Sequence, residues 1–219
     1  MKHLLFDCDG VLVDSEILAT HIALELFAEY GYHPDLETHA RTYAGMLEKD
    51  ILAGIEADTG VTFPDDILDI LFPRIREAMR TRLEGIPGMP ELVRSLPNPK
   101  AVVSNSGLPH VYQSLELIGL RDTFGERCFS STQVARPKPF GDLYEFAVEQ
   151  LGWEKDHILV IEDSITGVTA AKAAGLEVIG FLGANHIFDG HAEKAQAAGA
   201  DHLAADARAL EALLQRLAG

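Results

Sequence analysis

The segment Leu4-Leu5-Phe6-Asp7-Cys8-Asp9-Gly10 places two carboxylates directly after a short apolar run and before a glycine. The run at residues 4–6 has no polar alternation, which is typical of a strand buried on both faces of a sheet. Asp7 and Asp9 then stand at the carboxyl end of that strand. Residues two apart in an extended chain point to the same side, and two carboxylates held close either share a proton or hold a cation.

The chain after residue 84 alternates buried strands with helices. Further short apolar runs lie at residues 101–103, 128–129, 158–161 and 178–181. Helical patterns lie at residues 90–96, 109–118, 143–151, 166–174, 191–198 and 207–218. Several of these end near a glycine, which takes a left-handed C-terminal position without steric cost. Strands alternating with helices predict an α/β fold with a parallel sheet and right-handed crossovers.

Residues 15–84 interrupt this alternation with helical patterns and no strand pattern. Asp14 or Ser15 can cap a helix running to Gly31. Pro64 is predicted to open a later helix, and Pro73 to kink or split it. The sequence thus predicts a catalytic core of residues 1–14 plus 85–219 and an all-helical domain of residues 15–84. An insert that directly follows the strand carrying Asp7 is well placed to be a lid, although a structural module or a dimer face fits the pattern too.

Polar residues follow four of the predicted strands, at the carboxyl ends where ligands bind in open α/β sheets. They form the segments Asp7-Cys8-Asp9-Gly10, Ser104-Asn105-Ser106-Gly107, Arg136-Pro137-Lys138-Pro139 and Glu162-Asp163-Ser164. Acids crowded at two adjacent strand ends favour a hard divalent cation, and oxygen ligands without His or Cys favour Mg²⁺ over Zn²⁺.

The segment that begins at Ser104 leads into a predicted helix, so its backbone N–H groups and hydroxyls can bind a phosphate. Lys138, between two prolines, can supply the countercharge. Each motif alone is also compatible with an ordinary turn or a solvated surface. Together they predict a nucleophile, an anion cradle, a cation and a metal site at one edge of the sheet.

Composition narrows the classes of partner and location. The formal net charge of −16, from 34 acidic and 18 basic residues, argues against nucleic acid or an anionic membrane as a partner. Cys8 and Cys128 form no disulfide framework, and we find no signal peptide or bilayer-spanning run. We therefore expect a soluble cytoplasmic protein, monomeric or weakly dimeric, that binds a small molecule.

The four segments, in this order, resemble the motifs of the haloacid dehalogenase superfamily, in its branch with a helical cap after the first strand. The matching residues are Phe6-Asp7-Cys8-Asp9-Gly10-Val11-Leu12-Val13-Asp14-Ser15-Glu16, Val102-Val103-Ser104-Asn105, Lys138-Pro139-Phe140-Gly141-Asp142-Leu143-Tyr144 and Ile161-Glu162-Asp163-Ser164. The resemblance covers nearly the whole chain. It implies a doubly wound, Rossmann-like parallel sheet with strand order 3-2-1-4-5 and an all-helical cap domain.

The resemblance also implies a role for each motif residue. Asp7 would attack phosphorus and form an aspartyl-phosphate, while Asp9 would protonate the leaving alkoxide and then activate water. Ser104, Asn105 and Lys138 would bind the phosphoryl oxygens. Mg²⁺ would be held by Asp7, the Asp9 carbonyl, Asp163 and Glu162, the last as a direct ligand or as a partner of one. The implied activity is a Mg²⁺-dependent phosphatase acting on a small phosphate ester, such as a sugar or sugar-acid phosphate.

Three other functions are compatible with this fold. A β-phosphoglucomutase-like phosphohexomutase would use the same core, but the His and Arg that such enzymes carry in the cap fall here on Ala19 and Glu48. A haloacid dehalogenase typically lacks the second carboxylate, which is present here as Asp9. A catalytically silent scaffold has no need to crowd acids together. The phosphatase is therefore the leading interpretation and the mutase the alternative.

Overall fold

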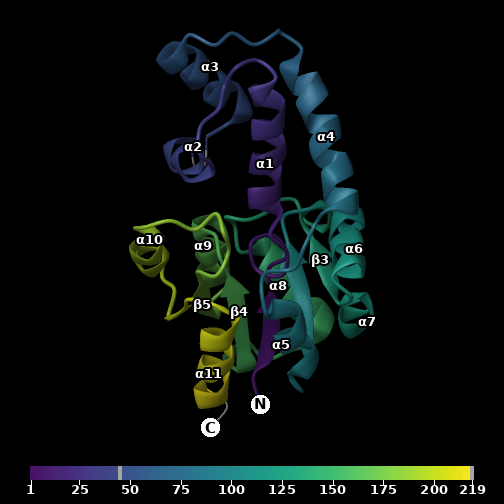
Figure 1. Ribbon diagram of the computed structural model, residues 1–219. Helices are drawn as coiled ribbons and strands as arrows, with labels where there is room; N and C mark the ends of the chain where they lie inside the picture. Colours follow the sequence, from purple (N-terminus) through teal and green to yellow (C-terminus); the bar gives the residue numbers. More distant parts are fainter. Residues whose placement is uncertain (44–45, 218–219) are drawn as a thin grey trace. The chain divides into compact units, whose positions relative to one another are not determined.

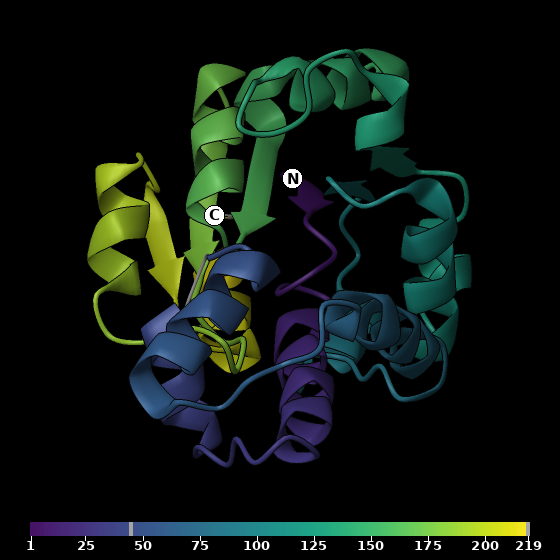
Figure 2. The ribbon, with the colours of Figure 1, turned by 90° about the horizontal axis from the view of Figure 1, so that it is seen from above.

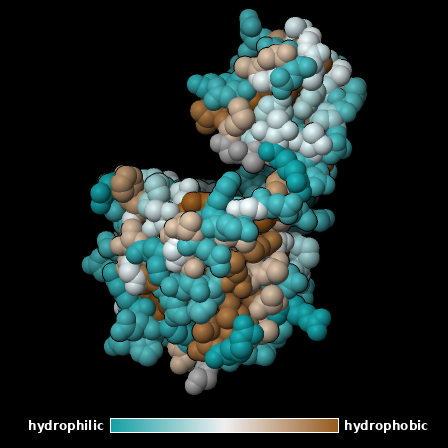
Figure 3. All heavy atoms as spheres, turned by 90° about the vertical axis from the view of Figure 1, so that its left-hand side faces the viewer, coloured by the Kyte–Doolittle hydropathy of each residue, from teal (hydrophilic) through white to brown (hydrophobic). Residues whose placement is uncertain are grey.

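The computed structural model describes residues 1–43 and 46–217. It contains two compact units, one of Met1–Asp14 with Glu84–Gly219 and one of Ser15–Leu83 (Figure 1). Figure 3 shows hydrophilic residues, in teal, mixed with apolar residues, in brown, on the visible face. Within the described residues, every helix is too short or too polar to cross a bilayer.

The first unit is built on a six-stranded sheet in the order β3-β2-β1-β4-β5-β6. The strands are β1 (His3–Phe6), β2 (Lys100–Ser104), β3 (Cys128–Ser130), β4 (Ile158–Glu162), β5 (Glu177–Phe181) and β6 (His202–Ala204). All neighbouring strands are parallel. Every residue of β2 and β4 is buried, which explains why the runs at residues 101–103 and 158–161 are apolar without alternation. The parallel sheet and the order of its first five strands confirm the prediction.

Helices cover both faces of this sheet. They are α5 (Met89–Ser95), α6 (Leu108–Leu117), α7 (Arg121–Phe124), α8 (Asp142–Leu151), α9 (Ile165–Ala173), α10 (His191–Ala197) and α11 (Ala207–Leu217), with short 3₁₀ turns η1 (Ser131–Gln133) and η2 (Lys155–His157). Figure 2 shows α8 and α9, in green, along one side of the strands. There, Leu143, Tyr144 and Val168 bury their side chains against Val103 and Val160 of the sheet. Right-handed crossovers bring α5, α6, α7 and α11 to the opposite face.

Two core elements were not predicted. Strand β6 has three residues and only one fully buried side chain, Ala204, so it lacks the apolar run that identifies the other strands. Helix α7 is a single turn, shorter than a hydrophobic period can reveal. The predicted last helix ends at Leu217 in the structure, and its expected final residue, Ala218, lies outside the described residues.

The second unit is helical in its described residues, which form α1 (Ser15–Ala28), α2 (Leu36–Tyr43), α3 (Glu48–Thr59) and α4 (Ile67–Thr81). Its own core includes Leu26, Ile55 and Leu71. One prediction was wrong in detail, because α4 begins three residues after Pro64. Pro73 lies inside α4, so of the two effects predicted for it the split does not occur. Proline removes one backbone donor, but the α4 residues buried on either side of it hold the helix together. That this unit acts as a lid stays a prediction.

Candidate active site

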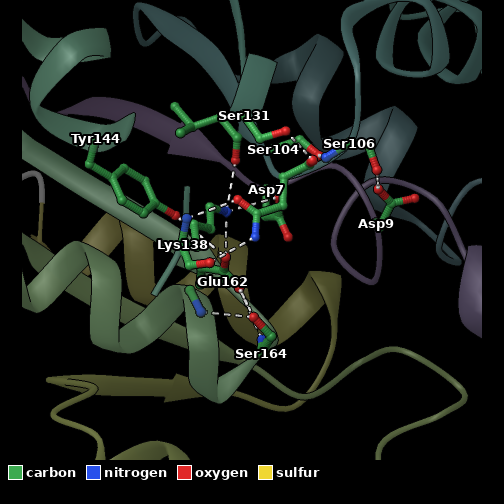
Figure 4. Close-up of polar contacts among 12 residues, drawn as sticks. Asp7, Asp9, Ser104, Ser106, Ser131, Lys138, Tyr144, Glu162 and Ser164 are labelled. Carbon is green, nitrogen blue, oxygen red and sulfur yellow. Dashed lines mark hydrogen bonds and ion pairs between the residues drawn. The ribbon is translucent and has the colours of Figure 1, made fainter. Parts of the chain in front are cut away.

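The register of the sheet brings three of the predicted motifs to one edge. Phe6 of β1 pairs with Val102 of β2 on one side and with Ile161 of β4 on the other. The residues that follow each of these therefore emerge together, so Asp7, Ser104 and Glu162 lie near one another at the carboxyl end of the sheet (Figure 4). The loop before α8 adds Lys138 from a different layer.

Lys138 lies at the centre of this cluster. Its Nζ donates to Glu162 Oε1 at 2.6 Å and to the carbonyl oxygen of Val103 at 2.9 Å, and it lies 3.1 Å from Asp7 Oδ1. The side chain is only 3% exposed. Burial disfavours its charge, but the negative charges of Asp7 and Glu162 outweigh that cost and raise the pKa of Lys138 above its usual value. Lys138 is therefore a buried ammonium ion directed at Asp7.

Glu162 is fully buried and engaged through both carboxylate oxygens. Besides Lys138, Oε1 has the Tyr144 hydroxyl 3.5 Å away, while Oε2 accepts from the backbone N–H and the hydroxyl of Ser164 at 3.0 and 3.1 Å. These contacts fix the carboxylate beneath Lys138 (Figure 4). In this arrangement Glu162 orients Lys138, a contact that the sequence did not predict, and its expected role at a metal stays a prediction.

The carboxylate of Glu162 also lies directly against Gly167 in the first turn of α9. A Cβ atom on Gly167 would fall 1.6 Å from Glu162 Oε1 and 2.0 Å from Cδ. No side chain can approach so closely, so glycine is required for Glu162 to sit against the helix and reach Lys138.

We expect Gly167→Ala to lower the free energy of unfolding by roughly 1–3 kcal/mol, the usual cost of overpacking, and to impair activity by displacing Glu162. Gly107→Ala is the matched control, because its Cβ would meet its nearest neighbour at an ordinary 3.8 Å. Urea unfolding of the two variants measures the difference. Equal stability of both would mean that Glu162 does not occupy the position against α9.

Asp7 is buried, and its charged neighbours include more carboxylates than ammonium groups. Burial and the charge of Glu162 raise the pKa of Asp7 well above its usual range, against the opposing effect of Lys138. Lys138 cannot neutralise both carboxylates, because it already bonds Glu162. An additional cation would therefore stabilise the ionised form of Asp7.

The donor set fits such a cation. Asp7, Glu162 and Asp163 are all buried, and each offers a carboxylate oxygen within 4.8 Å of the others. Opposite oxygens around one Mg²⁺ ion are about 4.2 Å apart, since each Mg–O bond is about 2.1 Å. Asp7 and Asp163 are the better candidates of the three, because the oxygens of Glu162 are already taken by hydrogen bonds.

The segment after β2 carries the residues that are predicted to form an anion cradle. Ser104 is 1% exposed, and its Oγ accepts from the backbone N–H of Ser106 at 3.0 Å. The Asn105 side chain binds the Lys138 backbone twice, donating to its carbonyl oxygen at 3.1 Å and accepting from its N–H at 3.0 Å. Asn105 therefore fixes the loop that delivers Lys138, a contact that the sequence did not predict.

Asp9 is bound by residues that follow this cradle. Its Oδ2 accepts from the Ser106 hydroxyl at 2.6 Å, and its Oδ1 lies 3.1 Å from His110 Nε2 on α6. The hydrogen bond to Asp9 raises the pKa of His110, against the opposing effect of burial. In Figure 4 Asp9 lies on the Ser106 side of the site, away from Glu162. No sequence pattern selects His110 as a site residue.

Two further histidines lie in the site, and both contact Asp163. His186 Nε2 lies 3.1 Å from Asp163 Oδ2, and His191 Nε2 lies 2.5 Å from its carbonyl oxygen. Both come from the segment after β5, at the carboxyl edge of the sheet. Gly10 backs the same carboxylate: its φ is +75°, and a Cβ there would fall 2.0 Å from Asp163 Oδ2.

Comparison with known proteins identifies relatives along most of the chain. The family model described as haloacid dehalogenase-like hydrolase matches residues 4–181. A 6-phosphogluconate phosphatase from Escherichia coli K12 is 26% identical over 187 residues, which are 85% of each chain. A phosphorylated carbohydrates phosphatase from Thermotoga maritima is 27% identical over 186 residues, covering 82% of this chain and 84% of that protein.

Solved structures show the same likeness. A HAD family hydrolase from Deinococcus radiodurans, crystallised with bound phosphate and sodium, is 33% identical with a TM-score of 0.87. The match covers 100% of this chain and 96% of that one.

Proposed function

We propose that this chain, which belongs to the haloacid dehalogenase-like hydrolase family, is a Mg²⁺-dependent phosphatase that hydrolyses a small phosphorylated sugar or sugar acid through an aspartyl-phosphate. One observation carries the proposal: the buried Asp7 carboxylate lies 3.1 Å from the Lys138 ammonium, beside a second acid, Asp163, with which it can share a cation. This arrangement is suited to an anionic nucleophile that must approach an anionic phosphate.

In the first step an Asp7 carboxylate oxygen attacks phosphorus while the bond to the leaving oxygen breaks. Asp9, protonated, gives its proton to that oxygen, so an alcohol departs and Asp9 becomes a carboxylate. Lys138 and the backbone N–H groups after Ser104 offset the charge on the phosphoryl oxygens. Mg²⁺, held by Asp7, Asp163 and the Asp9 carbonyl, would supply further positive charge at these oxygens.

In the second step Asp9 accepts a proton from a water molecule, whose oxygen attacks phosphorus. The bond between phosphorus and the Asp7 oxygen breaks, and the electron pair returns to the Asp7 carboxylate. Inorganic phosphate leaves, and Asp9 is again protonated. Each carboxyl group ends in the state in which it began, so the two half-reactions balance as net hydrolysis.

The relatives support the choice of substrate class. The names of the Escherichia coli and Thermotoga maritima relatives identify a sugar-acid phosphate and phosphorylated carbohydrates as their substrates. The net charge of −16 supports a partner of low molecular weight rather than nucleic acid or an anionic membrane. A monomer or weak homodimer stays the expected assembly.

We expect phosphate release from at least one of 6-phosphogluconate, sugar phosphates and polyol phosphates when Mg²⁺ is present. Chelation with EDTA should reduce release by about 10²-fold or more, since a charge that stabilises the transition state is lost, and added Mg²⁺ should restore it. A colorimetric phosphate assay measures both.

The same assay distinguishes the mutase. Conversion of glucose 1-phosphate into glucose 6-phosphate, with no free phosphate from any compound tested, would replace the phosphatase by a phosphohexomutase. Equal phosphate release with EDTA and with Mg²⁺ would contradict the metal requirement.

A further inference from the structure

Asp9 is bound through both of its carboxylate oxygens by residues of one segment of the fold. Ser106, after β2, donates its hydroxyl to Oδ2 at 2.6 Å, and His110, in the first turn of α6, lies 3.1 Å from Oδ1. Each carboxylate oxygen of Asp9 is therefore held by a different side chain. Rotation of the Asp9 side chain would break both contacts.

His110 is itself fixed by the helix that carries it. It is the third residue of α6, and the Ser114 hydroxyl, one turn further on, lies 3.5 Å from the same Nε2. The His110 side chain is 32% exposed and that of Asp9 is 22% exposed, so the pair lies at a solvent-accessible side of the site. By contrast, the side chains of Lys138 and Glu162 are 3% and 0% exposed. The Asp9–His110 pair is therefore accessible to a substrate.

We propose that His110 is a positioning residue that, with Ser106, holds the Asp9 carboxyl group in the orientation from which it protonates the leaving oxygen. This inference rests on the proposed function, since it assigns His110 a part in the first step of that reaction. General acid catalysis requires the acid to stay within hydrogen-bond reach of the leaving oxygen, and a misplacement of about 1 Å can cost about 10²-fold in rate.

The inference predicts an effect that depends on the leaving group. A sugar alkoxide needs a proton in order to leave, whereas p-nitrophenolate is stable enough to leave without one. Loss of Asp9 positioning should therefore slow hydrolysis of a sugar phosphate much more than hydrolysis of p-nitrophenyl phosphate. A general loss of structure at α6 would slow both substrates equally.

The test compares kcat/KM of wild type and His110→Ala with 6-phosphogluconate or the best sugar phosphate, and with p-nitrophenyl phosphate. This quantity reports the steps up to departure of the leaving group. We expect a loss of about tenfold or more with the sugar phosphate and less than about threefold with the aryl ester.

Two variants serve as controls. His110→Gln can place an amide N–H near the position of Nε2 and should recover part of the lost activity. His157→Ala removes an exposed histidine in η2, at the opposite end of β4, and should leave both substrates unaffected.

Three outcomes would overturn the inference. Equal losses with the two substrates would mean a structural role for His110. Faster hydrolysis of the sugar phosphate by His110→Ala would mean that the histidine holds Asp9 away from the leaving oxygen. Wild-type protein that hydrolyses neither ester would refute the proposed function as well, whereas the first two outcomes leave that function intact.

Discussion

Replacing Asp7 by asparagine is expected to reduce kcat by about 10⁴-fold or more with every phosphate ester the wild type hydrolyses. The amide has nearly the same shape as the carboxylate, but it lacks the negative oxygen that attacks phosphorus. Because the nucleophile is common to all substrates, the loss should not depend on the leaving group, unlike the loss expected for His110→Ala. Steady-state phosphate release measures it.

The same variant should remain folded. Asp7 is buried, and the charge of Glu162 disfavours its ionised form, so a neutral side chain removes electrostatic repulsion from the metal-free protein. We expect the urea midpoint of Asp7→Asn without Mg²⁺ to equal or exceed that of the wild type. Retention of more than about one hundredth of the wild-type rate would contradict Asp7 as the nucleophile.

Lys138→Met is expected to reduce both stability and activity. Methionine fills a similar volume but leaves the fully buried Glu162 without its ammonium partner at 2.6 Å. Breaking a buried ion pair by removing one partner costs about 3–5 kcal/mol, and loss of one charge-stabilising donor costs about 10²–10³-fold in kcat. Urea unfolding and phosphate release measure the two effects separately.

A double variant tests whether the uncompensated charge of Glu162 causes the loss of stability in Lys138→Met. Lys138→Met with Glu162→Gln removes both charges of the pair, so most of the lost stability should return while activity stays low. Glu162→Gln alone should lower activity less than Lys138→Met, because Lys138 keeps its contacts with Asp7 and with the Val103 carbonyl. Equal stability losses in Lys138→Met and the double variant would mean that the uncompensated charge of Glu162 is not the cause.

The sheet was predictable because burial imposes a strong pattern on its strands. Residues 158–161 and 178–181 are apolar without interruption, since helices cover both faces of β4 and β5. Strand β6 carries no such run, so its pairing with β5 became evident only in the structure. A local rule predicted that Pro73 kinks or splits its helix, but α4 continues past it, with residues buried on both sides of the proline.

The candidate site was predictable only in its motif residues. Asp7 follows β1 directly, and Ser104 and Glu162 are the last residues of β2 and β4, so the sheet alone brings them together. His110, His186 and Tyr144 reach the site from helices or loops, and their approach depends on side-chain packing that no sequence spacing encodes. The same holds for Gly167. This position requires a glycine only because the Glu162 carboxylate lies against it.

The most direct test of the account is to find where phosphate is attached during turnover. A substrate carrying radiolabelled phosphate would be mixed with the enzyme and Mg²⁺, quenched in acid within one turnover and digested, with Asp7→Asn treated in parallel. We expect label on the peptide that contains Asp7 in the wild type and none in the variant. Label on Ser104 or Asp9, or phosphate release with no labelled peptide at any quench time, would contradict it.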